Sequence, residues 1–279
     1  MTVSRAVREP VVAGTFYPSH PRALRRDVEV MLEEAADRLP EWRGAIVGAV
    51  VPHAGYPYSG PTAAVAYKAL ASRNFETAIL VGPSHREYFG SSSIFPGDAM
   101  ATPLGEVVVD KDLAREIVAR SDGLIASHAG HREEHALEVQ LPFLQVIRPT
   151  ARVVAITMGD QAPDRCAELA GALSAVVADR NVVLIASSDL SHYHPSPEAI
   201  RLDGLVVQQI RAFRPDLLLD DLEHDRVEAC GGGPIVAVMM AARALGASSA
   251  VILHVCNSGD ITGDLSSVVG YMSAILTTP

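Results

Sequence analysis

The stretch AIVGAVVPHAGYPYSG, residues 45–60, joins a continuous apolar run to a loop that holds a histidine, two prolines, two glycines and two tyrosines. An apolar run without polar alternation is typical of a strand that helices cover on both faces. A simple turn after such a strand needs fewer special residues than this loop contains. We therefore expect residues 45–51 to form a buried strand that delivers His53 to a pocket built with other parts of the chain.

Further apolar runs of the same character follow along the chain and predict buried strands at residues 78–81, 152–158, 182–186 and 250–255. Segments with helical periodicity lie around them and predict helices at residues 21–38, 61–72, 111–120, 133–146, 163–178, 197–213 and 234–245. Residues 91–110 instead predict short antiparallel strands joined by Pro and Gly turns, and residues 267–276 predict one more strand. This alternation predicts a single α/β domain over residues 1–279, with a largely parallel central sheet flanked by helices.

The composition excludes several classes of protein. The chain has 279 residues, of which 48% are hydrophobic, so it can bury a large core, and its net charge of −10 opposes binding to nucleic acid or to an anionic membrane. Residues 1–12 contain charges and a proline where a signal peptide needs an apolar segment. Cys166, Cys230 and Cys256 show no paired spacing, which favours free thiols. We expect a cytoplasmic protein without a nucleic-acid or membrane partner.

Histidines follow three of the predicted strands. His53 follows the first, His85 follows the second in GPSH, and His192 follows the strand at residues 182–186 in SSDLSHYH. Ligands of open α/β sheets bind outside the carboxyl ends of the strands, where the connecting loops converge. One loop histidine is more often a solvated side chain, but three at one edge predict a metal pocket or an acid/base cluster.

Cys230 lies in EACGGGP, directly before a glycine run that opens a predicted helix. A helix N-terminus favours the thiolate, which is the form that binds a metal or attacks an electrophile. Glycines there would let the backbone pass close to the occupant of a pocket. Two other interpretations stay open: the glycines cradle an anion, or Cys230 is a small buried apolar residue.

A nucleophilic site is an alternative to a metal site. Cys230, His192 and Asp189 have the residue types of a thiol, its base and the group that orients the base in a cysteine hydrolase. In that interpretation His53 and His85 bind the substrate. Tyr56, in the loop after His53, is a candidate for a hydrogen bond to a substrate.

A second alternative is the segment HREEH, residues 131–135, which fits the H-x-x-E-H pattern of a metallopeptidase class. That pattern requires a helix, and Gly130 directly before it disfavours one. We therefore expect Glu134 to serve a helix N-terminus and His131 to lie in a loop near the pocket mouth.

Five motifs together carry a resemblance to a known family. The ordered set PHAGYPYSG (52–60), GPSH (82–85), EEHALEVQLPFL (133–144), SSDLSHY (187–193) and CGGGP (230–234) resembles the Memo family, named for a mediator of cell motility. The likeness extends from AGTFYP, residues 13–18, to the last predicted strand. The Memo family resembles the class III extradiol ring-cleaving dioxygenases in fold, so the resemblance implies a pocket where those enzymes hold non-haem iron.

The resemblance implies roles for particular residues. Two metal-binding histidines fall on His53 and His85, and a catalytic histidine falls on His192, with Asp189 beside it. Dioxygenases use a carboxylate as the third ligand, but here that position is Cys230, and a softer thiolate suits copper, zinc or iron.

The resemblance also implies an activity and partners. It implies a metal-dependent oxidoreductase acting on a small organic substrate. Iron or copper is the favoured metal, and zinc is another option. Tyr56 and His135 are expected to lie beside the metal ligands or the substrate. Bacterial relatives are associated with a radical-SAM protein. A pocket that binds a metal ion or a peptide without turnover is the non-enzymatic alternative.

Overall fold

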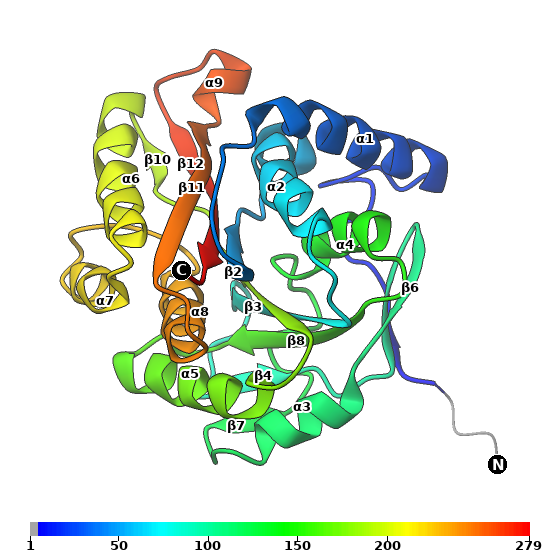
Figure 1. Cartoon of the computed structure of the whole chain (residues 1–279). Coiled ribbons are helices and arrows are strands. Elements are labelled where there is room, and N and C mark those ends of the chain that lie inside the picture. The colour runs from blue at the N-terminus through cyan, green and yellow to red at the C-terminus, as the bar shows by residue number, and fades with distance from the viewer. Residues whose placement is uncertain (1–4) are drawn as a thin grey trace.

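The computed structural model describes residues 5–279; residues 1–4, the start of the segment 1–12 considered above, lie outside the described part. The chain forms one α/β domain around a mixed central sheet (Figure 1). The strands of this sheet are β2 (Ile46–Val51), β3 (Thr77–Pro83), β4 (Ser92–Ile94), β7 (Leu124–Ala126), β8 (Arg152–Met158), β9 (Val182–Ser187), β10 (His192–His194), β11 (Ser249–Asn257) and β12 (Val268–Thr277).

The spatial order of the strands is β10-β12-β2-β9-β3-β8-β4-β7, and β11 pairs with β12. The four central strands β2, β9, β3 and β8 are parallel, as the sequence predicted. Antiparallel strands flank them, because β12 pairs antiparallel with β2 and β4 pairs antiparallel with β8. The last strand of the chain therefore lies inside the sheet.

A second, smaller sheet has the order β1 (Val7–Arg8), β5 (Ala99–Thr102) and β6 (Gly105–Val108). The strands β5 and β6 form the antiparallel hairpin expected within residues 91–110, whereas β4 from the same region joins the central sheet. Strand β1 pairs parallel with β5 and ties the N-terminal segment to this hairpin.

Helices cover both faces of the central sheet (Figure 1). The helices are α1 (Pro21–Glu34), η1 (Ala35–Arg38), α2 (Tyr56–Ala71), α3 (Lys111–Val118), η2 (Glu138–Gln140), α4 (Leu141–Ile147), α5 (Pro163–Val177), α6 (Ser196–Arg211), α7 (Pro215–Glu223), α8 (Gly232–Ala244) and α9 (Gly259–Thr262). Side chains of β9 alternate between the two cores: Val183 and Ile185 pack toward α1, α2 and α4, while Leu184 and Ala186 pack toward α5 and α8. Within residues 5–279, no helix combines the length and the apolar character needed to cross a membrane.

The helix predicted at residues 133–146 is wrong over its first half. Residues 133–137 are irregular, a 3-10 turn follows, and the α-helix begins only at Leu141. The carboxylate of Glu134 accepts the backbone N–H groups of His135 and Ala136, and this local bonding competes with a helical ladder. Two smaller differences are that α2 begins at Tyr56 rather than at residue 61 and that α7 was not predicted.

A buried ion pair fastens the N-terminal segment to the rest of the molecule. Arg8 Nη1 lies 2.7 Å from Glu138 Oε2, and their side chains are 6% and 0% exposed. The N–H groups of Val11 and Val12 and the hydroxyl of Tyr17 also donate to the Glu138 carboxylate. A charge this deep is tolerated because every carboxylate oxygen has hydrogen-bond donors.

We expect Glu138→Ala to destabilise the protein by about 3–5 kcal/mol, because the change leaves the Arg8 guanidinium buried without its counterion. The measurement is the free energy of unfolding from urea titration. Glu106→Ala, which removes an exposed ion pair with Arg5, is the control and should cost less than about 1 kcal/mol. Equal losses in the two variants would contradict this account of Glu138.

Candidate metal centre

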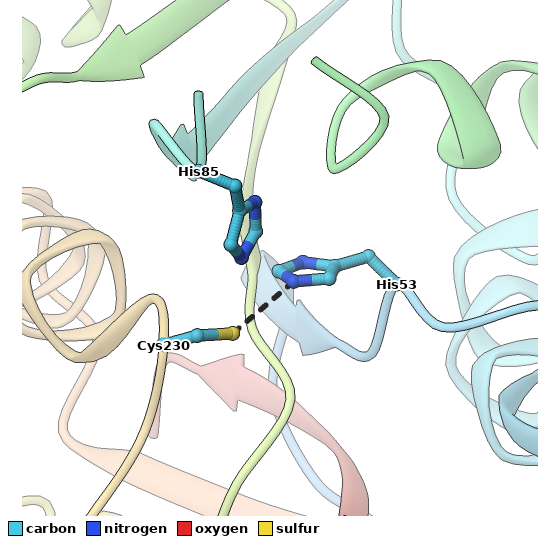
Figure 2. Close-up of side chains that lie close together, drawn as sticks. All are labelled: His53, His85 and Cys230. Carbon is cyan, nitrogen blue, oxygen red and sulfur yellow. Dashed lines mark hydrogen bonds between the residues drawn. The ribbon is translucent and has the colours of Figure 1, made fainter. Parts of the chain in front are cut away.

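Three side chains from distant parts of the chain meet at the carboxyl edge of the parallel strands. His53 follows β2, His85 follows β3, and Cys230 lies just before α8. The ligand atoms that they offer all lie within 4.8 Å of one another, and the three side chains point toward a common centre (Figure 2). Cys230 Sγ lies 3.1 Å from His53 Nε2. The three residues expected as metal ligands from the sequence are thus neighbours in the structure.

Hydrogen bonding assigns the tautomer of His53. The Ser187 hydroxyl donates its one hydrogen to the carbonyl of Ala136 at 2.7 Å and accepts from Nε2 of Gln140 at 2.9 Å. Toward His53 Nδ1, 3.0 Å away, the same oxygen therefore accepts. Nδ1 carries the hydrogen, and the lone pair of Nε2 faces Cys230.

A carboxylate assigns the tautomer of His85 in the same way. His85 Nδ1 lies 2.9 Å from Glu134 Oε1, and the backbone N–H of His85 donates to Oε2 at 2.7 Å. A carboxylate accepts hydrogen bonds, so Nδ1 of His85 is the donor and Nε2 is free. Burial opposes the charge on Glu134, but the hydrogen bonds and charge of His85 prevail and lower the Glu134 pKa to about 2.

Hydrogen bonds hold the sulfur and the backbone of Cys230 in place. Its Sγ accepts the backbone N–H of Asp189 at 3.3 Å. Gln161, in the loop after β8, donates from Nε2 to the Cys230 carbonyl at 2.9 Å and accepts the N–H of Gly233 at 2.8 Å. Loops after all four central strands therefore contribute to the site.

The glycine run allows close packing rather than anion binding. A Cβ on Gly231 would lie 2.4 Å from the carbonyl oxygen of Ser187, so only glycine fits against the end of β9. The N–H of Gly231 donates to the Ser188 hydroxyl, that of Gly232 to the Ala229 carbonyl, and that of Gly233 to Gln161. These donors already have partners, which argues against the anion cradle considered from the sequence.

Asp189 and His192 lie beside the cluster, but they do not form a hydrolase triad with the thiol. Asp189 Oδ1 accepts the backbone N–H of His53 at 2.7 Å. His192 Nδ1 donates to the carbonyl of Leu190 at 2.7 Å, which leaves Nε2 as an acceptor. Among residues 5–279 no hydrogen bond joins His192 to Cys230, and the imidazole in contact with the thiol is His53.

Burial keeps His53 and Cys230 uncharged. It lowers the pKa of His53 to about 3 and raises the pKa of the Cys230 thiol well above its usual value. The two groups are therefore a neutral thiol and a neutral imidazole, not the thiolate and imidazolium pair of a cysteine hydrolase. Burial also lowers the pKa of His135 to about 4.

His135 and Tyr56, expected beside the ligands, lie in different settings. The ring of His135 stacks on His85 with a centroid distance of 4.8 Å and also packs against Phe16. Tyr56 is buried, and its hydroxyl donates to the carbonyl of Val139 at 2.7 Å. Tyr56 therefore has a packing role, and His135 forms one wall of the site.

The position of His131 argues against the metallopeptidase pattern. His131 is only 2% exposed and donates from Nε2 to the carbonyl of Ser93 at 3.1 Å, so it does not lie at a pocket mouth. In the described chain, the groups with metal-binding spacing are His53, His85 and Cys230, and His85, Glu134 and His135. His131 is in neither group.

The fold and this cluster define an α/β protein with a histidine and cysteine site at the carboxyl edge of its sheet. A family model described as Memo-like protein matches residues 8–275. Similar relatives include MEMO1 family proteins from Methanopyrus kandleri, 38% identical over 96% of this chain and 98% of the relative, and from Methanobrevibacter smithii, 36% identical over 96% and 99%. The chain belongs to the Memo family.

A solved structure shares the fold. The crystal structure of uncharacterized protein JW3007 from Escherichia coli K12 aligns with a TM-score of 0.53 and 15% identity, covering 83% of this chain and 99% of that one. At this identity the likeness concerns the arrangement of helices and strands alone.

We expect the metal-free protein to show His53, His85 and His192 in the tautomer with hydrogen on Nδ1, because Ser187, Glu134 and Leu190 supply only acceptors there. The measurement is a long-range proton–nitrogen NMR spectrum, with exposed His20 as the reference. His53 should stay neutral as the pH falls to 5, because its pKa is lowered to about 3. A hydrogen on Nε2 of His53, or titration of its ring near 6.5, would contradict the assignment.

Proposed function

We propose that this protein binds one transition-metal ion through Nε2 of His53, Nε2 of His85 and Sγ of Cys230. The observation that carries the proposal is the convergence of ligand atoms of the three side chains within 4.8 Å, with Nδ1 of each histidine bonded outside the cluster. Two imidazoles and a thiolate suit iron, copper or zinc, and the soft sulfur favours copper or iron over a hard cation such as magnesium.

The spacing of the donors fits such an ion. Metal–sulfur and metal–nitrogen bonds of about 2.3 and 2.0 Å at a tetrahedral angle place the two donor atoms about 3.5 Å apart. The sulfur of Cys230 is 3.1 Å from Nε2 of His53, so a small side-chain rotation is sufficient. A bound cation would also compensate the charge of the Cys230 thiolate, which burial alone disfavours.

The activity that we propose is metal-dependent oxidation of a small organic molecule. A bound ion of this kind supplies redox and Lewis-acid chemistry. His192 is the acid/base residue, since its Nδ1 is bonded to the Leu190 carbonyl, which leaves Nε2 for proton transfer, and the residue is half-buried at the start of β10. Asp189 holds the His53 backbone and thereby the position of the first imidazole.

Metal or peptide binding without turnover is the second candidate function. A protein that only binds the metal ion needs the same three ligands, whereas only an enzyme needs the proton acceptor on His192. Burial disfavours a cysteine hydrolase, because it raises the pKa of the Cys230 thiol and lowers the pKa of His53, the imidazole that would have to take the thiol proton.

We expect the wild-type protein, purified without oxygen, to carry about one transition-metal ion per chain, and Cys230→Ser to lose it. Elemental analysis measures the content, and a sulfur-to-cobalt charge-transfer band after Co(II) loading reports the thiolate bond. Cys256→Ser, a change at a half-buried thiol bonded to Thr62, is the control and should keep both signals. Full metal content and an intact band in Cys230→Ser would refute the proposed site.

We expect His192→Ala to retain the metal ion but to slow dioxygen consumption by about 100- to 10,000-fold, the usual contribution of a general acid or base. Oxygen-electrode assays with a panel of catechol-type substrates test this, with metal content measured on the same samples. An unchanged rate would exclude His192 as the acid/base. If the metal-loaded wild type consumed no dioxygen with any substrate of the panel, the binding function would be favoured.

A further inference from the structure

The carboxylate of Glu134 has an unusual position beside the cluster. Its side chain is 2% exposed, and its two oxygens accept several N–H groups. Oε1 accepts from Nδ1 of His85 and from the backbone N–H groups of His135 and Ala136, each at 2.9 Å. Oε2 accepts the backbone N–H of His85 at 2.7 Å. The same carboxylate therefore holds both the main chain and the ring of His85.

Glu134 is spaced for metal binding, since it forms a group with His85 and His135 whose ligand atoms lie within 4.8 Å of one another. Its hydrogen bonds argue against that role. Three N–H groups, one of them the Nδ1–H of His85, already occupy Oε1, and a metal ion there would displace them. The arrangement fits a hydrogen-bond acceptor for His85 better than a second ion site.

The backbone of Glu134 is itself anchored. Its carbonyl accepts a hydrogen bond from Nη2 of Arg8, and Nη1 of Arg8 pairs with Glu138. Arg8 Nε also donates to the carbonyl of His131 at 2.6 Å. These bonds from Arg8 therefore restrain the irregular segment that contains Glu134 and keep it beside His85.

His85 needs such a partner more than His53 does. The side chain of His85 is 28% exposed, whereas His53 is 1% exposed and enclosed by the ends of β2 and β9. Packing alone leaves a half-exposed imidazole free to rotate or to exchange tautomers. Only a directed contact to one ring nitrogen can select a single orientation.

We propose that Glu134 is a positioning residue, whose carboxylate holds His85 as the Nδ1–H tautomer with Nε2 turned toward His53 and Cys230. Carboxylates that accept a hydrogen bond from a metal-binding histidine orient the ring and make it a stronger ligand. The expected effect on metal affinity rests on the proposed function. The expected effect on the His85 tautomer does not, because it is a property of the metal-free protein.

The test compares Glu134→Gln and Glu134→Asp with the wild type. The control is Glu133→Gln, the same change at the exposed residue next to Glu134. A glutamine side chain has one acceptor oxygen. It therefore cannot offer separate oxygens to the backbone N–H and to Nδ1 of His85, as the carboxylate does. We expect nitrogen NMR of the metal-free protein to show one tautomer of His85 in the wild type and in Glu133→Gln, and a mixture in Glu134→Gln. Competition with a chelator should show Co(II) affinity about 10- to 100-fold lower in Glu134→Gln, with an altered Co(II) spectrum.

The outcomes separate the two proposals. A wild type that binds no Co(II) would refute the proposed function, and the His85 tautomer would still decide the role of Glu134. A wild-type His85 with hydrogen on Nε2 would overturn the positioning role, even if every Glu134 variant failed to fold. A folded Glu134→Gln variant that kept the wild-type tautomer of His85 and the wild-type affinity for Co(II) would also overturn it. Two bound ions in the wild type and one in Glu134→Gln would instead make Glu134 a ligand.

Discussion

The parallel pairing of β2 with β9 and of β9 with β3 is the constraint on which the site depends. In that register Val51 lies opposite Ser187, and Val81 lies opposite Ala186, so the three strands end at nearly the same level. The residues that follow these three strands therefore enter one small region. His53, Ser187 and His85 are therefore neighbours, although up to 134 residues separate them along the chain.

The two imidazoles of the site direct their Nδ1 hydrogens away from its centre. Ser187 and Glu134 receive the Nδ1 hydrogens of His53 and His85, and the Asp189 backbone supplies an N–H to the sulfur of Cys230. The lone pairs of the two Nε2 atoms are left facing inward. Together with the sulfur of Cys230, they form the donor set of the proposed metal site.

The fold alone does not determine the chemistry. The Escherichia coli K12 structure shares the arrangement of elements at 15% identity, and membership of the Memo family is shown by relatives 36% and 38% identical over nearly the full chain. The proposed chemistry rests instead on which atoms face the pocket. A thiolate in place of a carboxylate changes the preferred metals and the charge that the site presents.

The amino-acid sequence by itself determined the α/β class and the central parallel strands, because runs such as residues 45–51 and 152–158 are apolar on both faces of a strand and can be buried only between helices. It also directed attention to His53 and His85, which follow such strands, and to Cys230, which precedes a glycine run that opens a helix. Only the tertiary structure decided that residues 133–137 are not helical and that Glu134 bonds His85. The bond between Glu134 and His85 joins segments 49 residues apart, and local periodicity gives no information on such a partner.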